Sequence, residues 1–427
     1  MKRFAKVLLW IVVVVALLVG LWLGGGNLVG DSMLRGAEKR WAEAFGSMDQ
    51  ILKEQPDADA NEPALKVETL AAALGIEISP RGLPKDRLQV LDREQKGVAA
   101  THVQIGIYIK DENARPGPIV EAPPAAVTAY LETHVQPLAE LRTYLLTAET
   151  PRWDSSLSRR YSAGLPNLLG HLKIHKLLLT DALTKIRAGD SAGALEDLEA
   201  SWRLNLSLAS RHELMSQLIY IAAYRYQAAA LRKLPSAPEV WQERLEAGSY
   251  RAGMHKAVAF EGLAGAGSAS AVMDSGESAL PKWMRIFTVP FIKCVIARDL
   301  DFIRPKVPEV EGKKECVEGP AASQPNESDS IISLNSLENA WMRVRRLALD
   351  QELTRKILQL KAERARTGSW PAQLPSSIEE SICPDRKWVY QVSSDGAMSL
   401  SFNADLKRDD MLRIPLRYEE AAPAPKP

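Results

Sequence analysis

The first strong pattern along the chain is an apolar stretch close to its start. Residues 7–23 contain no charged side chain. As an α-helix, such a stretch covers about 26 Å, slightly less than the roughly 30 Å of a bilayer's hydrocarbon core. Trp10 and Trp22 lie near its two ends, where amphipathic rings favour the membrane interface. Three basic residues precede the stretch: Lys2, Arg3 and Lys6.

This pattern predicts an uncleaved transmembrane anchor at 7–23 behind a cytoplasmic tail at 1–6. A cleaved signal peptide is the alternative, but its apolar core usually has about 7–15 residues and a small-x-small site follows it. Gly24 to Leu28, which follow here, have no Ala-x-Ala pattern. The basic residues favour a cytoplasmic N-terminus. We therefore expect a single-pass protein of a bacterial inner membrane, with the bulk of the chain in the periplasm.

Beyond the anchor, apolar residues recur at helical spacing. Between Asp31 and Glu54 they recur every three, four or seven positions, which predicts an amphipathic helix. The segment 56–61 breaks this helix. Pro63 fits the first turn of a second helix, and Gly75 follows as its stop.

The clearest structural signal lies between residues 164 and 234, where three apolar stripes of helical period follow one another. Gly189 and Asp190 fit the C-cap of the first helix and the N-cap of the second. Ser210 and Glu213 fit a capping box before the third. Helices joined by links this short pack as antiparallel neighbours.

The C-terminal part combines a linker, a long helix and a small β module. Residues 305–333 are rich in Pro, Glu, Lys and Ser, which predicts a flexible linker. Residues 334–366 have the pattern of a long helix. Apolar and polar residues alternate on both sides of residues 393–396, which predicts a β-hairpin, and residues 412–418 fit a third strand. Residues 421–427 fit a disordered tail.

The expected fold is therefore mainly α: one N-terminal transmembrane helix, an extracytoplasmic bundle of helical hairpins at 31–304, and a C-terminal α+β module with a β-hairpin at 334–420. Hydrophobic residues make up 46% of the 427 residues and charged residues 25%, which is typical of a globular protein. A net charge of +1 argues against a polybasic protein, so we expect no nucleic-acid partner.

The three cysteines are too few for a disulfide framework. A bridge between Cys294 and Cys316 would close a short loop. Cys383 has no adjacent cation or histidine to activate its thiol, which favours a structural or bridged role. The sequence leaves the pairing open.

Two histidines four residues apart, His171 and His175, are the best candidates for metal ligands. On one helix face this spacing can hold Zn²⁺. However, Leu172 stands where a zinc protease carries its general-base Glu, and His175 lies on the apolar stripe. A buried histidine pair is the simpler interpretation, so we expect no metal and no cofactor.

Other chemical patterns are weaker. Asp57, Asn61 and Glu68 have the spacing of EF-hand ligands, but Glu62 occupies the position that requires glycine. The Gly-, Ala- and Ser-rich residues 262–276 lack the Gly-x-Ser-x-Gly order of a nucleophile elbow and fit close helix packing or a mobile loop. We expect no catalytic residue in either pattern.

A surface segment at 283–292 combines aromatic and aliphatic residues with flanking cations, which is typical of a membrane-interface segment. Trp283, Phe287 and Phe291 are the residues expected to contact lipid. Pro290 interrupts the pattern, so packing against the helical bundle is the alternative.

The long helix after residue 334 carries many cations. We expect them to form a solvated face, with contact to anionic lipid or an acidic partner as the alternative. These cations are Arg343, Arg345, Arg346, Arg355, Lys356, Lys361, Arg364 and Arg366.

Two resemblances come from short motifs. The Ala-Gly-Asp-x-x-x-Ala motif at 188–194 looks like a tetratricopeptide turn, although no 34-residue repeat accompanies it. With residues 151–153, 165–170 and 61–76, this stretch resembles uncharacterised single-pass, membrane-anchored bacterial helical proteins, which have no known activity. The long helix followed by Gly368-Ser-Trp-Pro and a hairpin is similar in layout to the C-terminal part of major pseudopilins.

The leading interpretation is a non-enzymatic scaffold, anchored in the membrane through residues 7–23, that binds another envelope protein through its helical hairpins. Helix pairs offer grooves for partners, and no convergent set of reactive groups is visible in the sequence. An envelope hydrolase with distant carboxylates is the alternative. A third interpretation is an accessory component of a secretion or pilus-type machine.

Overall fold

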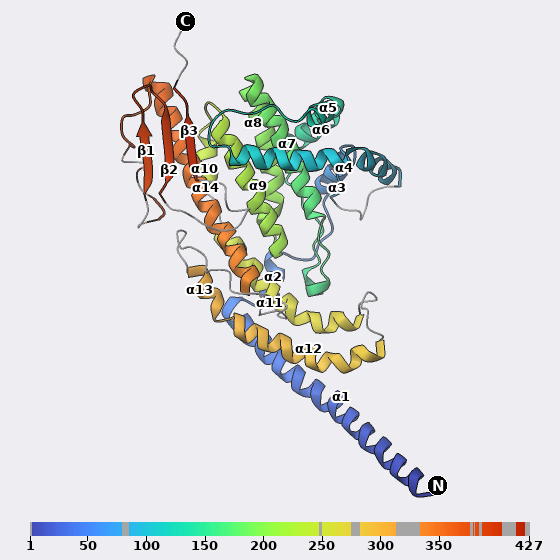
Figure 1. Ribbon diagram of the computed structural model, residues 1–427. Coiled ribbons are helices and arrows are strands. Elements are labelled where there is room, and N and C mark those ends of the chain that lie inside the picture. Colours follow the sequence, from blue (N-terminus) through green and yellow to red (C-terminus); the bar gives the residue numbers. More distant parts are fainter. Residues whose placement is uncertain are drawn as a thin grey trace.

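The computed structural model describes residues 2–78, 85–246, 250–274, 282–312, 334–375, 379, 381–383, 387–403 and 416–422. Helices make up 74% of the structure, and a three-stranded antiparallel sheet lies near the C-terminus. This confirms the mainly α-helical fold. A long N-terminal helix projects from one end of the molecule, and the sheet lies at the opposite end (Figure 1).

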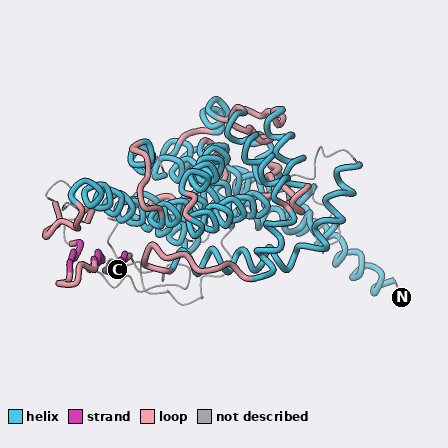
Figure 2. The backbone as a smooth tube through the Cα atoms, turned by 90° about the horizontal axis from the view of Figure 1, so that it is seen from above, coloured by secondary structure: helices cyan, strands magenta, loops and turns pink. Residues whose placement is uncertain are grey.

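Helix α1, Lys2–Phe45, runs unbroken from the N-terminus into the folded body. Its first half stands clear of the other elements, while its second half packs against α11, Tyr250–Asp274, and α12, Lys282–Ile303 (Figures 1 and 2). By length and composition, α1 is the one helix in the described ranges that could cross a membrane.

Glycine ends α1 at a position that the sequence analysis missed. Gly46 has φ +101, in the left-handed region that favours glycine, and α2 follows at Met48–Glu54. The Ser47 hydroxyl accepts from the Gln50 amide, and the Gln50 side chain accepts from the Ser47 amide, which makes a capping box. The segment predicted as one helix over 31–54 therefore contains two helices, and the first is continuous with the apolar stretch 7–23.

The next elements enclose the centre of the molecule. Asn61 caps α3 by accepting a hydrogen bond from the Ala64 amide, and Pro63 lies in the first turn as predicted. The elements of this part are α3 (Glu62–Ala72), α4 (Lys85–Ala114), α5 (Ala125–Thr133), α6 (Val135–Thr147) and a 3₁₀ helix, η1 (Leu157–Ser162).

Three consecutive helices pack together at the centre: α7 (Leu168–Ala188), α8 (Ser191–Ala209) and α9 (Leu214–Lys233). Gly189 has φ +83 at the end of α7, and the Asp190 side chain accepts from the Gly193 amide, which confirms both predicted caps. The predicted capping box at the start of α9 is wrong. Glu213 makes no cap bond there, because its carboxylate pairs with Arg211.

The C-terminal helix α14, Leu334–Thr367, lies between α9 and the sheet. The sheet has the order β1-β2-β3 and pairs Trp388 with Phe402 and Leu400 with Tyr418. These four side chains are buried in one hydrophobic cluster with Ile357 and its neighbours on α14. The strands are β1 (Trp388–Val392), β2 (Met398–Phe402) and β3 (Arg417–Glu420).

Two short helices complete the description: α10, Val240–Glu246, and α13, Lys306–Gly312. Helix α13 lies at the start of the predicted linker, and its Val307 and Val310 are buried in the main core. The rest of that linker, 313–333, lies outside the described residues.

Candidate functional site

The histidine pair predicted from the sequence lies on the inner face of α7. His171 and His175 are both completely buried. His171 Nε2 is 3.2 Å from the Ser207 hydroxyl, and His175 Nδ1 is 2.9 Å from the Ser201 hydroxyl. Both serines belong to α8, so the histidines join these two helices.

The hydrogen bonds of Ser207 assign the proton of His171. Its hydroxyl donates to the Leu204 carbonyl at 2.6 Å and accepts from the Trp153 indole at 2.9 Å. The remaining lone pair of the Ser207 oxygen can only accept a hydrogen bond, so the His171 Nε2 atom is the donor and carries the proton. Its Nδ1 has no partner among the described residues.

Ser201 contacts His175 in a similar way. It accepts from the Gln227 amide at 2.8 Å, which leaves the hydroxyl one proton and one lone pair for His175 Nδ1. The bond between Ser201 and His175 can therefore run in either direction. His175 Nε2 has no partner in the described part of the chain.

Burial makes these imidazoles neutral. Desolvation lowers the pKa of His175 to about 3 and that of His171 well below its usual value. Neutral imidazole is the form that binds metals, but no three His, Cys, Asp or Glu side chains of the described residues converge on a metal position. The pair therefore links helices in the core.

The residues with EF-hand spacing serve separate local roles. Asp57 accepts from the amide of Ser158 at 3.1 Å and from its hydroxyl. Asn61 caps α3, and Glu68 is buried within that helix. These contacts disperse the oxygen atoms that a calcium ion would need together.

Close helix packing explains the first glycine of the small-residue segment. A Cβ atom on Gly262 would lie 2.0 Å from Cε2 of Trp41, so only glycine lets α11 approach α1 this closely. The side chain of Ser268 lies outside the described residues.

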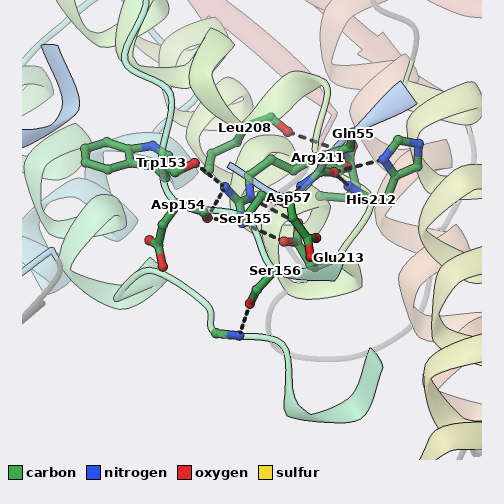
Figure 3. A network of polar contacts seen from close by, with 12 residues as sticks. Gln55, Asp57, Trp153, Asp154, Ser155, Ser156, Leu208, Arg211, His212 and Glu213 are labelled. Carbon is green, nitrogen blue, oxygen red and sulfur yellow. Dashed lines mark hydrogen bonds and ion pairs between the residues drawn. The ribbon is translucent and has the colours of Figure 1, made fainter. Parts of the chain in front are cut away.

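A cluster of polar contacts lies where the turn between α8 and α9 meets α2 and the segment 153–156 (Figure 3). Arg211 donates to both carboxylate oxygens of Glu213, at 3.0 and 2.6 Å, and to the Asp154 carbonyl at 3.1 Å. The side chains of this ion pair are only 5% and 3% exposed. Removing one partner of such a pair leaves a buried charge without compensation.

Gln55 holds the second half of this cluster. Its side-chain oxygen accepts from the His212 amide at 2.7 Å and contacts ring Nδ1 at 2.8 Å, while its amide donates to the Ser155 hydroxyl at 3.0 Å. His212 Nε2 lies 3.3 Å from the Glu54 carboxylate. A serine, a histidine and a carboxylate are the groups of a hydrolase, but Gln55 separates Ser155 from the ring and no serine–histidine bond forms.

The sequence analysis missed this cluster because its members come from three distant segments. The Arg-His-Glu sequence at 211–213 was the one available signal, and it was interpreted as a helix cap. The cluster fastens the α8–α9 turn to α2, which is a structural role.

The predicted solvated cationic face of α14 is wrong for half of its members, because α14 is enclosed between α9 and the sheet. The Asp350 carboxylate lies 2.9 Å from Arg225 and 3.4 Å from Arg346. Lys361 donates to the Arg232 carbonyl at 2.7 Å. Four cations are at most 6% exposed: Arg345, Arg346, Lys356 and Lys361.

The cysteines divide into two kinds. Cys383 is buried and disulfide-bonded, while Cys294 is free. The possible bridge between Cys294 and Cys316 is therefore excluded. Cys316 itself lies outside the described residues.

A cleft of about 1080 Å³ lies between residues 115–121 and the sheet. The sheet itself is at the end of the molecule opposite the N-terminal half of α1 (Figure 1). Its walls are largely apolar, with Ile119 on one side and Val392 and Met398 on the other. The amide of Glu419 donates to the Pro116 carbonyl at 3.0 Å and ties one wall to β3.

The charged side chains that line this cleft are all paired. Arg115 lies 3.0 Å from Glu112 and 3.3 Å from Glu121. The other two carboxylates of the lining also contact arginines, Glu419 with Arg417 at 3.5 Å and Glu420 with Arg364. Largely apolar walls with paired charges suit this cleft to ligand binding.

Comparison with known proteins adds no constraint. No family model, curated protein or solved structure matches the chain.

Proposed function

We propose that this protein is a membrane-anchored scaffold whose folded domain lies outside the cytoplasm and binds an extended segment of another envelope protein. The continuity of α1 is the observation that carries the proposal. The apolar side chains in the first half of α1 are exposed, while Trp41 near its end is completely buried. The Trp41 indole donates to the Ala259 carbonyl at 3.1 Å, and Arg40 donates to Asp301 at 2.9 Å.

This connection gives the anchor a mechanical role. A flexible tether would let the domain rotate freely above the membrane. An unbroken helix that ends in the hydrophobic core instead holds the domain at a defined height and orientation. Such positioning is what a scaffold requires.

Two observations support a location outside the cytoplasm. The basic residues lie on the N-terminal side of the apolar stretch, as in proteins with a cytoplasmic N-terminus. Cys383 is disulfide-bonded, and disulfides persist in the periplasm but rarely in the cytosol.

We place partner binding at the sheet cleft rather than on the helical hairpins. The inner helices α7, α8 and α9 are buried along most of their length by the elements around them. The cleft is open, and among the described strands none pairs with the outer edge of β1. An extended polypeptide can bind such a site through main-chain groups and apolar pockets.

A tag placed after Pro427 tests the topology. Protease added to intact spheroplasts should remove the tag, whereas a tag protected until detergent is added would overturn the proposal.

Photo-crosslinking in intact cells tests the binding site. A photoreactive residue at Gln391, in the cleft, should give one discrete adduct. The same residue at Leu65, exposed on α3 and away from both the cleft and β1, is the control. No adduct at Gln391, or the same adduct at both positions, would contradict a specific cleft partner.

An envelope hydrolase at the His212 cluster is the second candidate, because Ser155 and Glu54 lie beside that histidine. It requires Gln55 to move out from between Ser155 and His212. Labelling of Ser155 by a fluorophosphonate would favour this candidate.

A further inference from the structure

The charge-free parts of α1 and α12 both end, at their C-terminal side, at the same level. In α1 no charged residue occurs between Lys6 and Asp31, and in α12 none occurs from Ile286 until Lys293. The Lys293 ammonium lies 2.7 Å from the Asp31 carboxylate and 3.0 Å from the Asn27 side-chain oxygen. One ion pair therefore marks the boundary between polar and apolar zones on both helices.

Below this ion pair the two helices are in close contact. A Cβ atom on Gly26 would lie 3.1 Å from Cβ of Pro290, and one on Gly30 would lie 3.0 Å from Cβ of Lys293. Small residues four apart allow this approach, as they do between membrane helices. Further down, the Trp22 indole donates to the Phe287 carbonyl at 2.9 Å, so these two residues are level.

The outer surface of this helix pair is apolar. Its large exposed side chains include Phe291, at 61% exposure, and Leu28, at 72%. A contiguous exposed apolar surface marks a contact with a membrane or a protein. Its other members in this zone are Leu21, Val29, Ile286 and Phe287.

The length of the anchor places this surface in the membrane. About 20 helical residues cross a hydrocarbon core. Counted from Val7, they end near Gly26, so Trp22 and Phe287 lie inside the outer boundary. Lys293 and Asp31 then lie at the level of the headgroups.

We propose that the N-terminal half of α12 is embedded in the outer leaflet of the bilayer, beside the emerging end of α1. This deepens the proposed function, because it rests on α1 as the anchor and adds a second membrane contact. Two contacts fix the rotation of the domain as well as its height. The cleft then faces a constant direction.

The bilayer is favoured over a protein as the occupant because the α12 surface is continuous with the apolar surface of α1. Phe287 and Phe291, predicted to contact lipid, are exposed here; the side chain of Trp283 lies outside the described residues.

Spin-label accessibility tests this proposal on the full chain in lipid nanodiscs. Single cysteines replace Phe291 or, as a second site, Ile286 in a Cys294→Ser background, and each is labelled with a nitroxide. Phe302 is the matched control. It is also an exposed phenylalanine of α12, but it lies about 16 Å further from the membrane and Lys306 covers its ring at 4.9 Å.

Labels at 291 and 286 should be severalfold more accessible to oxygen than to a water-soluble nickel complex, and the label at 302 should show the reverse. Nickel access at both 291 and 286 would overturn the proposal. Exclusion of both relaxants would also overturn it, because a protein partner or a second copy would then cover the surface. A label at Leu18 separates this outcome from failure of the anchor, since that label should remain in lipid even if α12 does not.

Discussion

Acid should destabilise this protein through its buried histidine pair. His175 has a folded-state pKa of about 3, and burial also lowers the pKa of His171 well below the ordinary value of 6.5. In the unfolded chain both rings titrate near 6.5. Below that pH the unfolded chain binds more protons, so the free energy of unfolding falls as pH falls. Above it, the pair contributes no pH dependence.

The size of the effect follows from the width of this window. Each proton changes the free energy of unfolding by about 1.4 kcal/mol per pH unit. Between pH 6.5 and 4.5, His175 alone therefore removes about 2 kcal/mol, and His171 acts in the same direction. The contribution of His175 alone is already a sizeable part of the roughly 5–15 kcal/mol that stabilises a typical domain.

Urea unfolding of the detergent-solubilised full chain, followed by circular dichroism, measures this loss. The wild type should lose at least about 2 kcal/mol more between pH 7 and 4.5 than a His171→Gln/His175→Gln variant, and the single His175→Gln variant should recover about 2 kcal/mol of that difference. Other groups titrate equally in both proteins and cancel.

His255→Gln is the matched control with the opposite sign. The Glu311 carboxylate, 2.8 Å from the ring, raises the pKa of His255. This histidine therefore contributes stability at acidic pH that is lost as pH rises through its folded pKa. Its removal should lower stability at pH 5 more than at pH 8. Identical pH profiles for the wild type and the double variant would refute the reasoning.

Three further predictions concern packing and polar contacts. Gly262→Leu forces the new side chain into Trp41 and should lower the unfolding free energy by about 1–3 kcal/mol, seen as a lower urea midpoint, whereas Gly262→Ala should cost less. Arg211→Ala leaves the buried Glu213 carboxylate without its partner and should lower the free energy of unfolding by about 3–5 kcal/mol. The Arg211→Ala/Glu213→Ala variant should be more stable than Arg211→Ala, and equal stabilities would exclude this explanation. Asn61→Ala removes the cap of α3 and should lower the free energy of unfolding by about 1 kcal/mol, while Asn61→Asp should retain most of the stabilisation by the cap.

Features encoded by neighbouring residues could be predicted from the sequence. Gly189 and Asp190 cap their helices as expected, because a left-handed glycine and a short acidic side chain act within one turn. The β-hairpin around residues 393–396 formed for the same reason. A third strand is described at Arg417–Glu420, where it overlaps the end of the strand predicted at 412–418; residues 412–415 lie outside the described residues.

Features that depend on distant partners could not be predicted. The cations of α14 look solvated in the sequence, but Lys361 is buried because α9 and the sheet enclose that helix. Glu213 has the spacing of a cap, yet the stronger pairing with Arg211 takes its carboxylate. The apolar segment of α12 was recognised, but its contact with α1 depends on an ion pair between Lys293 and Asp31, residues far apart in the chain.

The distance between two spin labels in nanodiscs tests most directly whether the proposed membrane helix and the folded domain form one rigid unit. One label replaces Leu18, exposed in the apolar first half of α1, and the other replaces Met215, exposed on α9. Both are introduced in a Cys294→Ser background. A continuous α1 should give a single narrow distribution of distances by pulsed electron paramagnetic resonance. A broad distribution, as from a hinged tether, would exclude a rigid connection.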